Sequence, residues 1–325
     1  MTRAVRRRGA ASRHPEAGFT LVEVMSALAI LAVAMTAVFA TFTTQQKSFT
    51  VQSRVVEMQQ NLRQGVEYLT RDIRLAGYGL PIAVALPGGV LPSGTTIRTL
   101  FPVDNTTGPD SLYLIYMLDM DASQPPTTNT ILMASGAGLV DVASVTGFVA
   151  TGGELVLITD GIFADLFETS AAAGNVLTFG GGYGYNAVAH NGYGVGPPPA
   201  TVSKARFARY FIDATTDPAH PTLMVDRMAG QAPQPVADDI EDLQLTYGLD
   251  TNADGVVDTW IASPSVAQVL QIRQVRLELL ARTRFPDKNW SETRPTLGNR
   301  TDAATADGYR RRTIDVVIDV RNSGV

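Results

Sequence analysis

The sequence contains no cysteine and only three histidines among its 325 residues. The lack of cysteine excludes a disulfide framework and any thiolate metal site. Neither an HExxH pattern nor a GxSxG pattern is present, so the common signatures of zinc hydrolases and serine hydrolases are missing. We therefore expect a protein that is not an enzyme.

Charged residues are also few, at 18% of the chain, and the formal net charge is −5. Five arginines and one glutamate precede Gly18 and give that segment a charge of +4, so the remainder carries −9. Nucleic-acid binding requires a clustered basic face, which an acidic body does not offer. No nucleic-acid partner is expected. Since 45% of the residues are hydrophobic, the chain can bury a sizeable core in one or two domains.

A long uncharged run is the first positive feature. No charged residue occurs from Val24 to Gln46, and the part that ends at Phe42 is almost wholly apolar. At about 1.5 Å per residue such a run spans roughly 30 Å, the thickness of a bilayer core. We expect a transmembrane helix over about residues 22–43. The preceding arginines predict that the amino terminus stays in the cytoplasm and that the rest of the chain crosses outward.

The small-residue break Ala17-Gly18 lies before the apolar run, whereas a secretory signal carries its cleavage site after the run. Cleavage at Gly18 would remove residues 1–18 as a basic leader. This order of parts, with "GFTLVE" from Gly18 to Glu23, resembles the type IV prepilin family. The resemblance implies that a leader peptidase, the prepilin peptidase, cuts after Gly18 and that Phe19 is then methylated.

Glu23 is an acidic residue at the start of an otherwise apolar run. A charged side chain inside a bilayer costs roughly 2.5–3.5 kcal/mol on insertion scales, so it usually marks a pairing partner or a function. The prepilin resemblance implies that Glu23 is a subunit-docking residue, which pairs with the free amine of a neighbouring subunit. The alternative is a signal anchor whose Glu23 reaches the lipid headgroups.

The region after the apolar run also has helical periodicity. Apolar residues recur at spacings of three and four, and no proline occurs between Phe19 and Pro81. The stripe comprises Val51, Val55, Met58, Leu62, Val66, Leu69 and Ile73. We expect a helix from about Phe19 to Leu75, with the stripe in the core. We expect the other sides of the helix to be exposed to water. They carry Arg54, Glu57, Arg63, Glu67, Arg71 and Asp72. The segment "LAGYGLP" is expected to end the helical region by about residue 79.

Short strand patterns between turn clusters follow Pro81. The expected strands are Ser111–Leu118, Glu154–Asp160, Asn175–Phe179, Lys204–Asp213, Thr222–Asp226, Val275–Thr283 and Arg311–Asn322. A long helix followed by a strand-rich body predicts an α+β fold with antiparallel pairing. The expected organisation is a leader over residues 1–18, a helix over 19–79 and a β-rich body over 80–325, with an irregular insertion at about 81–200.

Three segments of the second half narrow the resemblance: Ile240–Asp250, Val275–Thr283 and Arg311–Asn322. Together with the amino terminus they resemble the PilW family of minor pilins, and the resemblance implies a type IV pilin-like fold. Minor pseudopilins of type II secretion, of the J type, share the general plan and remain an alternative.

The segment "DTNADGVVD" has the spacing of a calcium loop. Asp250, Asn252 and Asp254 supply oxygens at the first, third and fifth positions, Gly255 allows the sharp turn, the Val256 carbonyl is seventh and Asp258 is ninth. The twelfth position is Ile261, so the usual bidentate glutamate is missing, and a further oxygen would have to come from elsewhere. The candidates are Asp238, Asp239, Glu241 and Asp242. The alternative is a hairpin turn without metal. No other cofactor is expected.

The family resemblance implies a minor pilin that helps to start or cap a type IV pilus. Its partners would be the prepilin peptidase, other minor pilins, the major pilin and the inner-membrane assembly platform. It would reside in the bacterial inner membrane and then at the tip of a surface filament. A pilus-tip adhesin and a membrane-anchored enzyme are the other hypotheses.

Overall fold

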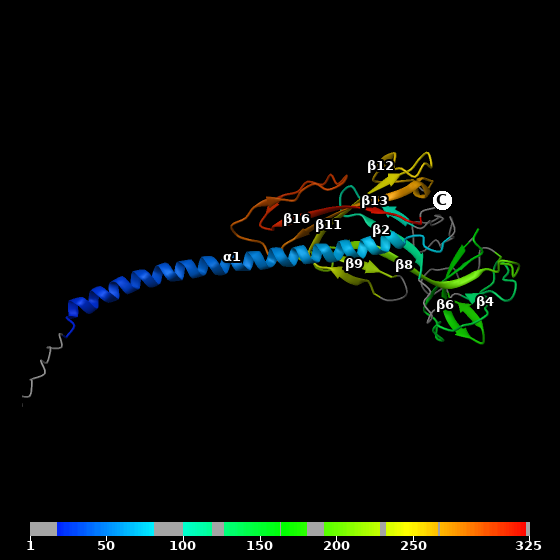
Figure 1. Cartoon of the computed structure of the whole chain (residues 1–325), viewed down its shortest axis with the longest axis horizontal. Coiled ribbons are helices and arrows are strands. Elements are labelled where there is room, and N and C mark those ends of the chain that lie inside the picture. Colours follow the sequence, from blue (N-terminus) through cyan, green and yellow to red (C-terminus); the bar gives the residue numbers. More distant parts are fainter. Residues whose placement is uncertain are drawn as a thin grey trace, which may run out of the picture. The chain divides into compact units, whose positions relative to one another are not determined.

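The computed structural model describes residues 18–80, 100–118, 127–162, 164–180, 192–227, 232–265 and 267–322. Its contacts divide the chain into two units, one up to Ser53 and one from Arg54 onward. Helix α1 (Leu21–Leu75) supplies residues to both units (Figure 1). The helix predicted from about Phe19 to Leu75 is therefore confirmed.

The part of α1 from Arg54 onward packs on the β-rich body. The predicted stripe is buried at Met58, Leu62, Leu69 and Ile73, and Val55 and Val66 are partly buried beside it. Burying each large apolar side chain contributes roughly 1.5–3 kcal/mol, which is far more than the helix propensity of any one residue. Tertiary packing therefore holds this half of the helix in place.

Gly65 lies at the closest approach between α1 and the body. A Cβ at this position would lie 3.2 Å from a methyl carbon of Leu223 and 3.4 Å from one of Leu279. The missing side chain thus lets the helix backbone sit directly on the strands.

The predicted helix end is also confirmed. Gly77 follows the last helical turn with φ of 80°, a left-handed conformation that glycine adopts without strain. Its N–H donates to the Ile115 carbonyl at 2.9 Å, and the Met117 N–H donates to the Tyr78 carbonyl at 2.9 Å. These two bonds attach the end of the helix to a strand of the body.

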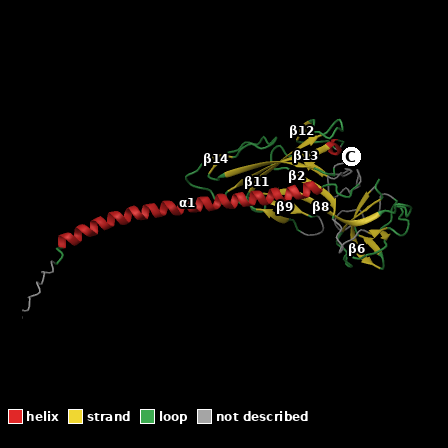
Figure 2. Cartoon of the chain, in the orientation of Figure 1, coloured by secondary structure: helices red, strands yellow, loops and turns green. Residues whose placement is uncertain are grey.

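One antiparallel sheet lies against this half of α1 (Figure 2). Among the described residues its strand order is β12-β11-β13-β16. The register pairs Leu279 with Leu243 on one side and with Ile314 on the other, so these side chains share the face that meets the helix. The bounds are β11 (Ile240–Leu249), β12 (Thr259–Ile261), β13 (Ile272–Arg282) and β16 (Arg311–Asp319).

A larger antiparallel sheet forms the rest of the body, and its longest strand is β8 (Thr201–Asp213). In the described part of the chain its order is β1-β2-β8-β5-β6-β7-β4; β3 and β9 also pair with β8, and β10 pairs with β9. The other bounds are β1 (Leu100–Val103), β2 (Ser111–Met117), β3 (Thr127–Thr128), β4 (Leu139–Asp141), β5 (Leu155–Thr159), β6 (Ala164–Ala173), β7 (Val176–Phe179), β9 (Thr222–Asp226) and β10 (Gln234–Ala237). Short elements η1 (Gln268–Gln271), β14 (Glu292–Thr293) and β15 (Ala306–Asp307) complete the body.

Together the helix and the two sheets confirm the predicted α+β class with antiparallel pairing. The region expected to be an irregular insertion differs from that expectation, because its described part contributes β1 to β7 to the sheet of β8. Strand β6 had no strong sequence signal, since "ADLFETSAAA" is poor in β-branched residues. Its pairing with β5 and β7, which no local pattern encodes, makes it a strand.

Candidate assembly site

The predicted cleavage site, Gly18 and Phe19, lies directly before α1, and both residues are exposed. A Cβ placed on Gly18 would meet no atom within 4 Å. The folded chain therefore does not itself require glycine here. A requirement set by a processing enzyme would explain it. The leader residues before Gly18 lie outside the described residues.

Glu23 occupies the third position of the first helical turn. Its backbone N–H donates to the Thr20 hydroxyl at 3.2 Å and to the Thr20 carbonyl at 3.1 Å, so Thr20 caps the helix. Thr20 and Glu23 have the spacing of a capping box, a signal that the sequence reasoning missed. Within the described residues the Glu23 carboxylate makes no ion pair. It is therefore open to a cation from another chain.

The membrane-length part of α1 exposes its apolar side chains on every face. One 18-residue window of the helix is long and apolar enough to cross a bilayer, with a mean hydropathy of 2.2. Its hydroxyls do not need water, because Ser26, Thr36 and Thr41 each donate to the carbonyl four residues earlier, at 2.8–2.9 Å. This surface suits lipid or the helices of other subunits.

A buried carboxylate fastens the second half of α1 to the body. Asp72 is fully buried and accepts hydrogen bonds from the Tyr210 hydroxyl at 2.6 Å and from the Arg227 guanidinium at 3.0 Å. Burial, and then the nearby Asp72 charge, raise the pKa of the Tyr210 hydroxyl. The expectation that Asp72 faces water is therefore wrong. Helical spacing placed Asp72 beside the stripe, but it could not show that a hydroxyl on β8 and a guanidinium after β9 lie within hydrogen-bond distance.

Two family models match the sequence. Residues 13–39 match the prokaryotic N-terminal methylation motif, and residues 209–322 match Type IV Pilus-assembly protein W. Together the two matches support the resemblance to PilW-type pilins. The first match contains Gly18, Phe19 and Glu23, and the second contains every strand of the sheet that faces α1. The methylation motif implies processing by a prepilin peptidase and, with the apolar helix, membrane anchoring.

The matched family is one of pilin structural proteins and not of known enzymes. A solved structure, a type IV-like pilin from Thermus thermophilus, aligns with 82% of this chain and 96% of its own length, at 12% identity and a TM-score of 0.38. No curated protein matches the sequence.

The loop that was predicted to bind calcium connects β11 to β12. Its backbone has the predicted sharp turn, since Gly255 has φ of 88° and donates its N–H to the Asp250 carboxylate at 3.0 Å. Asp258 accepts from the Thr251 N–H and hydroxyl, both at 2.7 Å, and these bonds lower the pKa of the Asp258 carboxyl. Hydrogen bonds therefore close the loop across its base.

Asp250 also pairs with a basic side chain of the same chain. The Arg273 guanidinium lies 3.1 Å from the Asp250 carboxylate. Burial acts to raise the pKa of this carboxyl, but the Arg273 bond and the loop N–H groups outweigh it and the pKa is lowered. Asn252 and Asp254 contact each other at 3.1 Å on the exposed side of the loop, where the Val256 N–H donates to Asp254. The described residues contain no group of three or more His, Asp or Glu side chains arranged to hold a metal ion.

The acidic residues suggested as additional calcium ligands are engaged elsewhere. Asp242 is buried between the guanidinium groups of Arg294 and Arg300, at 3.3 and 3.0 Å. Glu241 pairs with the buried Arg311 at 2.6 Å. Asp239 contacts His220 at 2.9 Å, and Asp238 lies 3.9 Å from Arg284. These four acidic side chains therefore face basic side chains of the body, and the Glu241 pair joins β11 to β16.

Proposed function

We propose that this pilin is a minor subunit that helps to initiate a type IV pilus or to cap its tip, after cleavage following Gly18 and methylation of Phe19. The observation that carries the proposal is the open Glu23 carboxylate at the start of the apolar, exposed first half of α1. In a low-dielectric environment such a carboxylate needs a cationic partner. Cleavage of a neighbouring subunit would release an amino-terminal amine that is positively charged and lies at a similar depth in the membrane.

The proposal includes a location and partners. The chain would sit in the inner membrane with its amino terminus in the cytoplasm, and it would then enter the filament and reach the cell surface. Other minor pilins, the major pilin and the assembly platform would be its partners. The match to a pilus-assembly family favours a pilus over a type II secretion system.

The first test is mass spectrometry of the amino terminus, in cells with and without the prepilin peptidase. We expect a mature chain that begins at N-methylated Phe19 only when the peptidase is present. An intact chain, or a cut beyond the apolar run, would contradict the proposal.

The second test separates membrane insertion from filament entry. Glu23→Gln keeps the side-chain size and removes the charge, and Glu23→Asp keeps the charge. We expect both variants to reach the inner membrane, and only Glu23→Asp to retain measurable incorporation into sheared filaments. If the Glu23→Gln variant enters filaments as well as the wild type does, the docking role of Glu23 is contradicted. Normal piliation of a strain that lacks the gene would remove the function itself.

A further inference from the structure

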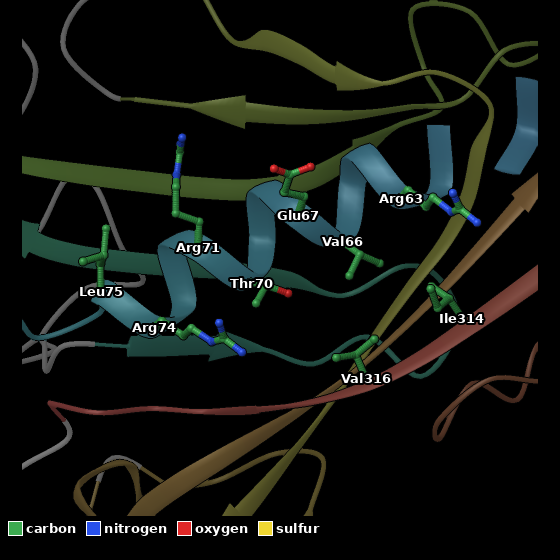
Figure 3. Close-up of a pocket in the computed structure, with 9 residues that line it drawn as sticks. All are labelled: Arg63, Val66, Glu67, Thr70, Arg71, Arg74, Leu75, Ile314 and Val316. Atoms are coloured by element: carbon green, nitrogen blue, oxygen red, sulfur yellow. The ribbon is translucent and has the colours of Figure 1, made fainter. Parts of the chain in front are cut away.

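A groove of about 660 Å³ runs between the second half of α1 and strand β16, entirely within the unit that begins at Arg54. Figure 3 shows Val66, Thr70 and Arg74 on the side of α1 that faces β16, and Ile314 and Val316 across from them. Glu67 and Arg71 also line the groove, although their side chains point away from β16 (Figure 3). The wall of the groove that β16 forms is apolar.

The groove is an uncovered continuation of the core. Ile314 pairs with Leu279 and Val316 with Leu277, and both leucines are fully buried beneath the helix. Residues opposite each other in antiparallel strands share a face, so Ile314 and Val316 belong to the core face of the sheet. They are only half-buried because α1 does not extend over the last strand. In the described part of the chain β16 pairs with β13 alone, which leaves its outer edge open.

Unpaired positive charge marks both ends of the groove. Arg63 and Arg74 are exposed and eleven residues apart, about 16 Å along a helix. Among the described residues neither guanidinium has a carboxylate within ion-pair distance. The third arginine of this stretch, Arg71, already contacts Asp72 at 3.2 Å.

The middle of the groove holds an unsatisfied polar atom. The Thr70 hydroxyl is enclosed, and in the described structure it has no hydrogen-bond partner. A helical threonine usually donates to the carbonyl of an earlier turn, so this enclosed hydroxyl would gain a partner from an incoming chain only if its side chain rotated into the groove.

We propose that this groove receives a segment of a different pilin subunit, in which apolar side chains are flanked by carboxylates that pair with Arg63 and Arg74. The inference rests on the proposed function, because it assumes that the chain assembles with other pilins. A second copy of this chain fits poorly, since its own rim would bring arginines against arginines. Pairing two β16 strands about Val317 would also place Asp315 of one copy opposite Asp319 of the other.

The test is site-specific photo-crosslinking of the full chain in piliated cells. Val316→p-benzoylphenylalanine places the probe in the groove. The matched control, Val317→p-benzoylphenylalanine, places it one residue away on the opposite, exposed face of the same strand. We expect the Val316 probe to crosslink to a peptide of another pilin subunit that carries Asp or Glu beside apolar residues, well above the Val317 signal.

The charge requirement is tested in the same strain. The double variant Arg63→Glu and Arg74→Glu should lower the crosslink yield about fivefold, because two rim ion pairs become repulsive contacts. The double variant Arg63→Lys and Arg74→Lys keeps both charges and should keep the crosslink. Four results would overturn the proposal. They are a crosslink that charge reversal does not weaken, a crosslink to a second copy of this chain, a crosslink within the chain itself, and a Val316 crosslink no stronger than that of Val317. Failure of the proposed function would instead appear as normal piliation when the gene is deleted, whatever the crosslinking result.

Discussion

The hydroxyl of Tyr210 donates a 2.6 Å hydrogen bond to the Asp72 carboxylate, although 138 residues separate the two in the sequence. The bond joins the last turns of α1 to β8, and Arg227 completes the site. A buried carboxylate of this kind is stable only while its partners are in place. It therefore makes the attachment of the helix sensitive to single substitutions.

Asp72→Ala should destabilise the protein by about 3–5 kcal/mol, because the Arg227 charge and the Tyr210 hydroxyl lose their buried partner. The measurement is urea unfolding of the detergent-solubilised full chain. Arg71→Ala is the matched control: its side chain is 54% exposed, so its pair with Asp72 should contribute less than about 1 kcal/mol. Equal stability of the two variants would show that Asp72 does not anchor the helix.

Gly65→Leu should destabilise the protein by about 1–3 kcal/mol, since a side chain at this point pushes the helix off Leu223 and Leu279. The neighbouring Gln64 is exposed, so Gln64→Leu should change the stability by no more than about 0.5 kcal/mol. Both effects can be read from thermal melts. A Gly65→Leu variant as stable as Gln64→Leu would mean that the helix has room to move away.

Asp110 should make stability fall as the pH rises towards neutrality. Burial, with smaller effects of the Asp104 and Asp242 charges, raises the pKa of its carboxyl to about 7, although the N–H groups of Asn105 and Leu245 act in the other direction. A folded-state pKa above the unfolded value of 3.8 gives stability that is complete below pH 3.8. The stability is lost progressively up to about pH 7 and is level above it.

The check is the melting temperature between pH 5 and pH 7.5, for the wild type and Asp110→Asn. We expect a downward slope in the wild type and a smaller slope in the variant. Burial also raises the pKa of the Asp242 carboxyl, so Asp242 accounts for the slope that remains in the Asp110→Asn variant. The carboxyl of Asp302, with a pKa of about 2 set mainly by its bond to Arg300, titrates below this window. Identical slopes would exclude Asp110 as the source.

Calcium binding by the loop from Asp250 to Asp258 stays a prediction of the sequence. We expect Ca²⁺ to raise the melting temperature relative to EDTA, because a bound ion stabilises the folded state. Asp254→Ala should abolish that increase while leaving the Arg273 pair with Asp250 intact. If the wild type melts at the same temperature in Ca²⁺ and in EDTA, hydrogen bonds alone hold the turn.

Local sequence patterns were sufficient for one part of the molecule. Three features of α1 depend on neighbours within a few residues: the length of its apolar run, its buried stripe and its glycine-containing end. Periodicity and composition therefore predict them directly. The prepilin motif is equally local, since Gly18, Phe19 and Glu23 lie within six consecutive residues. The strand patterns of β13 and β16 alternate clearly because each has one face in the core.

Other features depend on which strands become neighbours. The burial of Asp72, the pairing of Asp242 with Arg294 and Arg300, and the assignment of β6 as a strand all require partners that are distant in the sequence. The groove beside β16 exists only because α1 crosses the sheet without covering its last strand. Periodicity shows which side of an element is apolar. It cannot show where the opposing surface ends, because that boundary is set by the packing of the whole body.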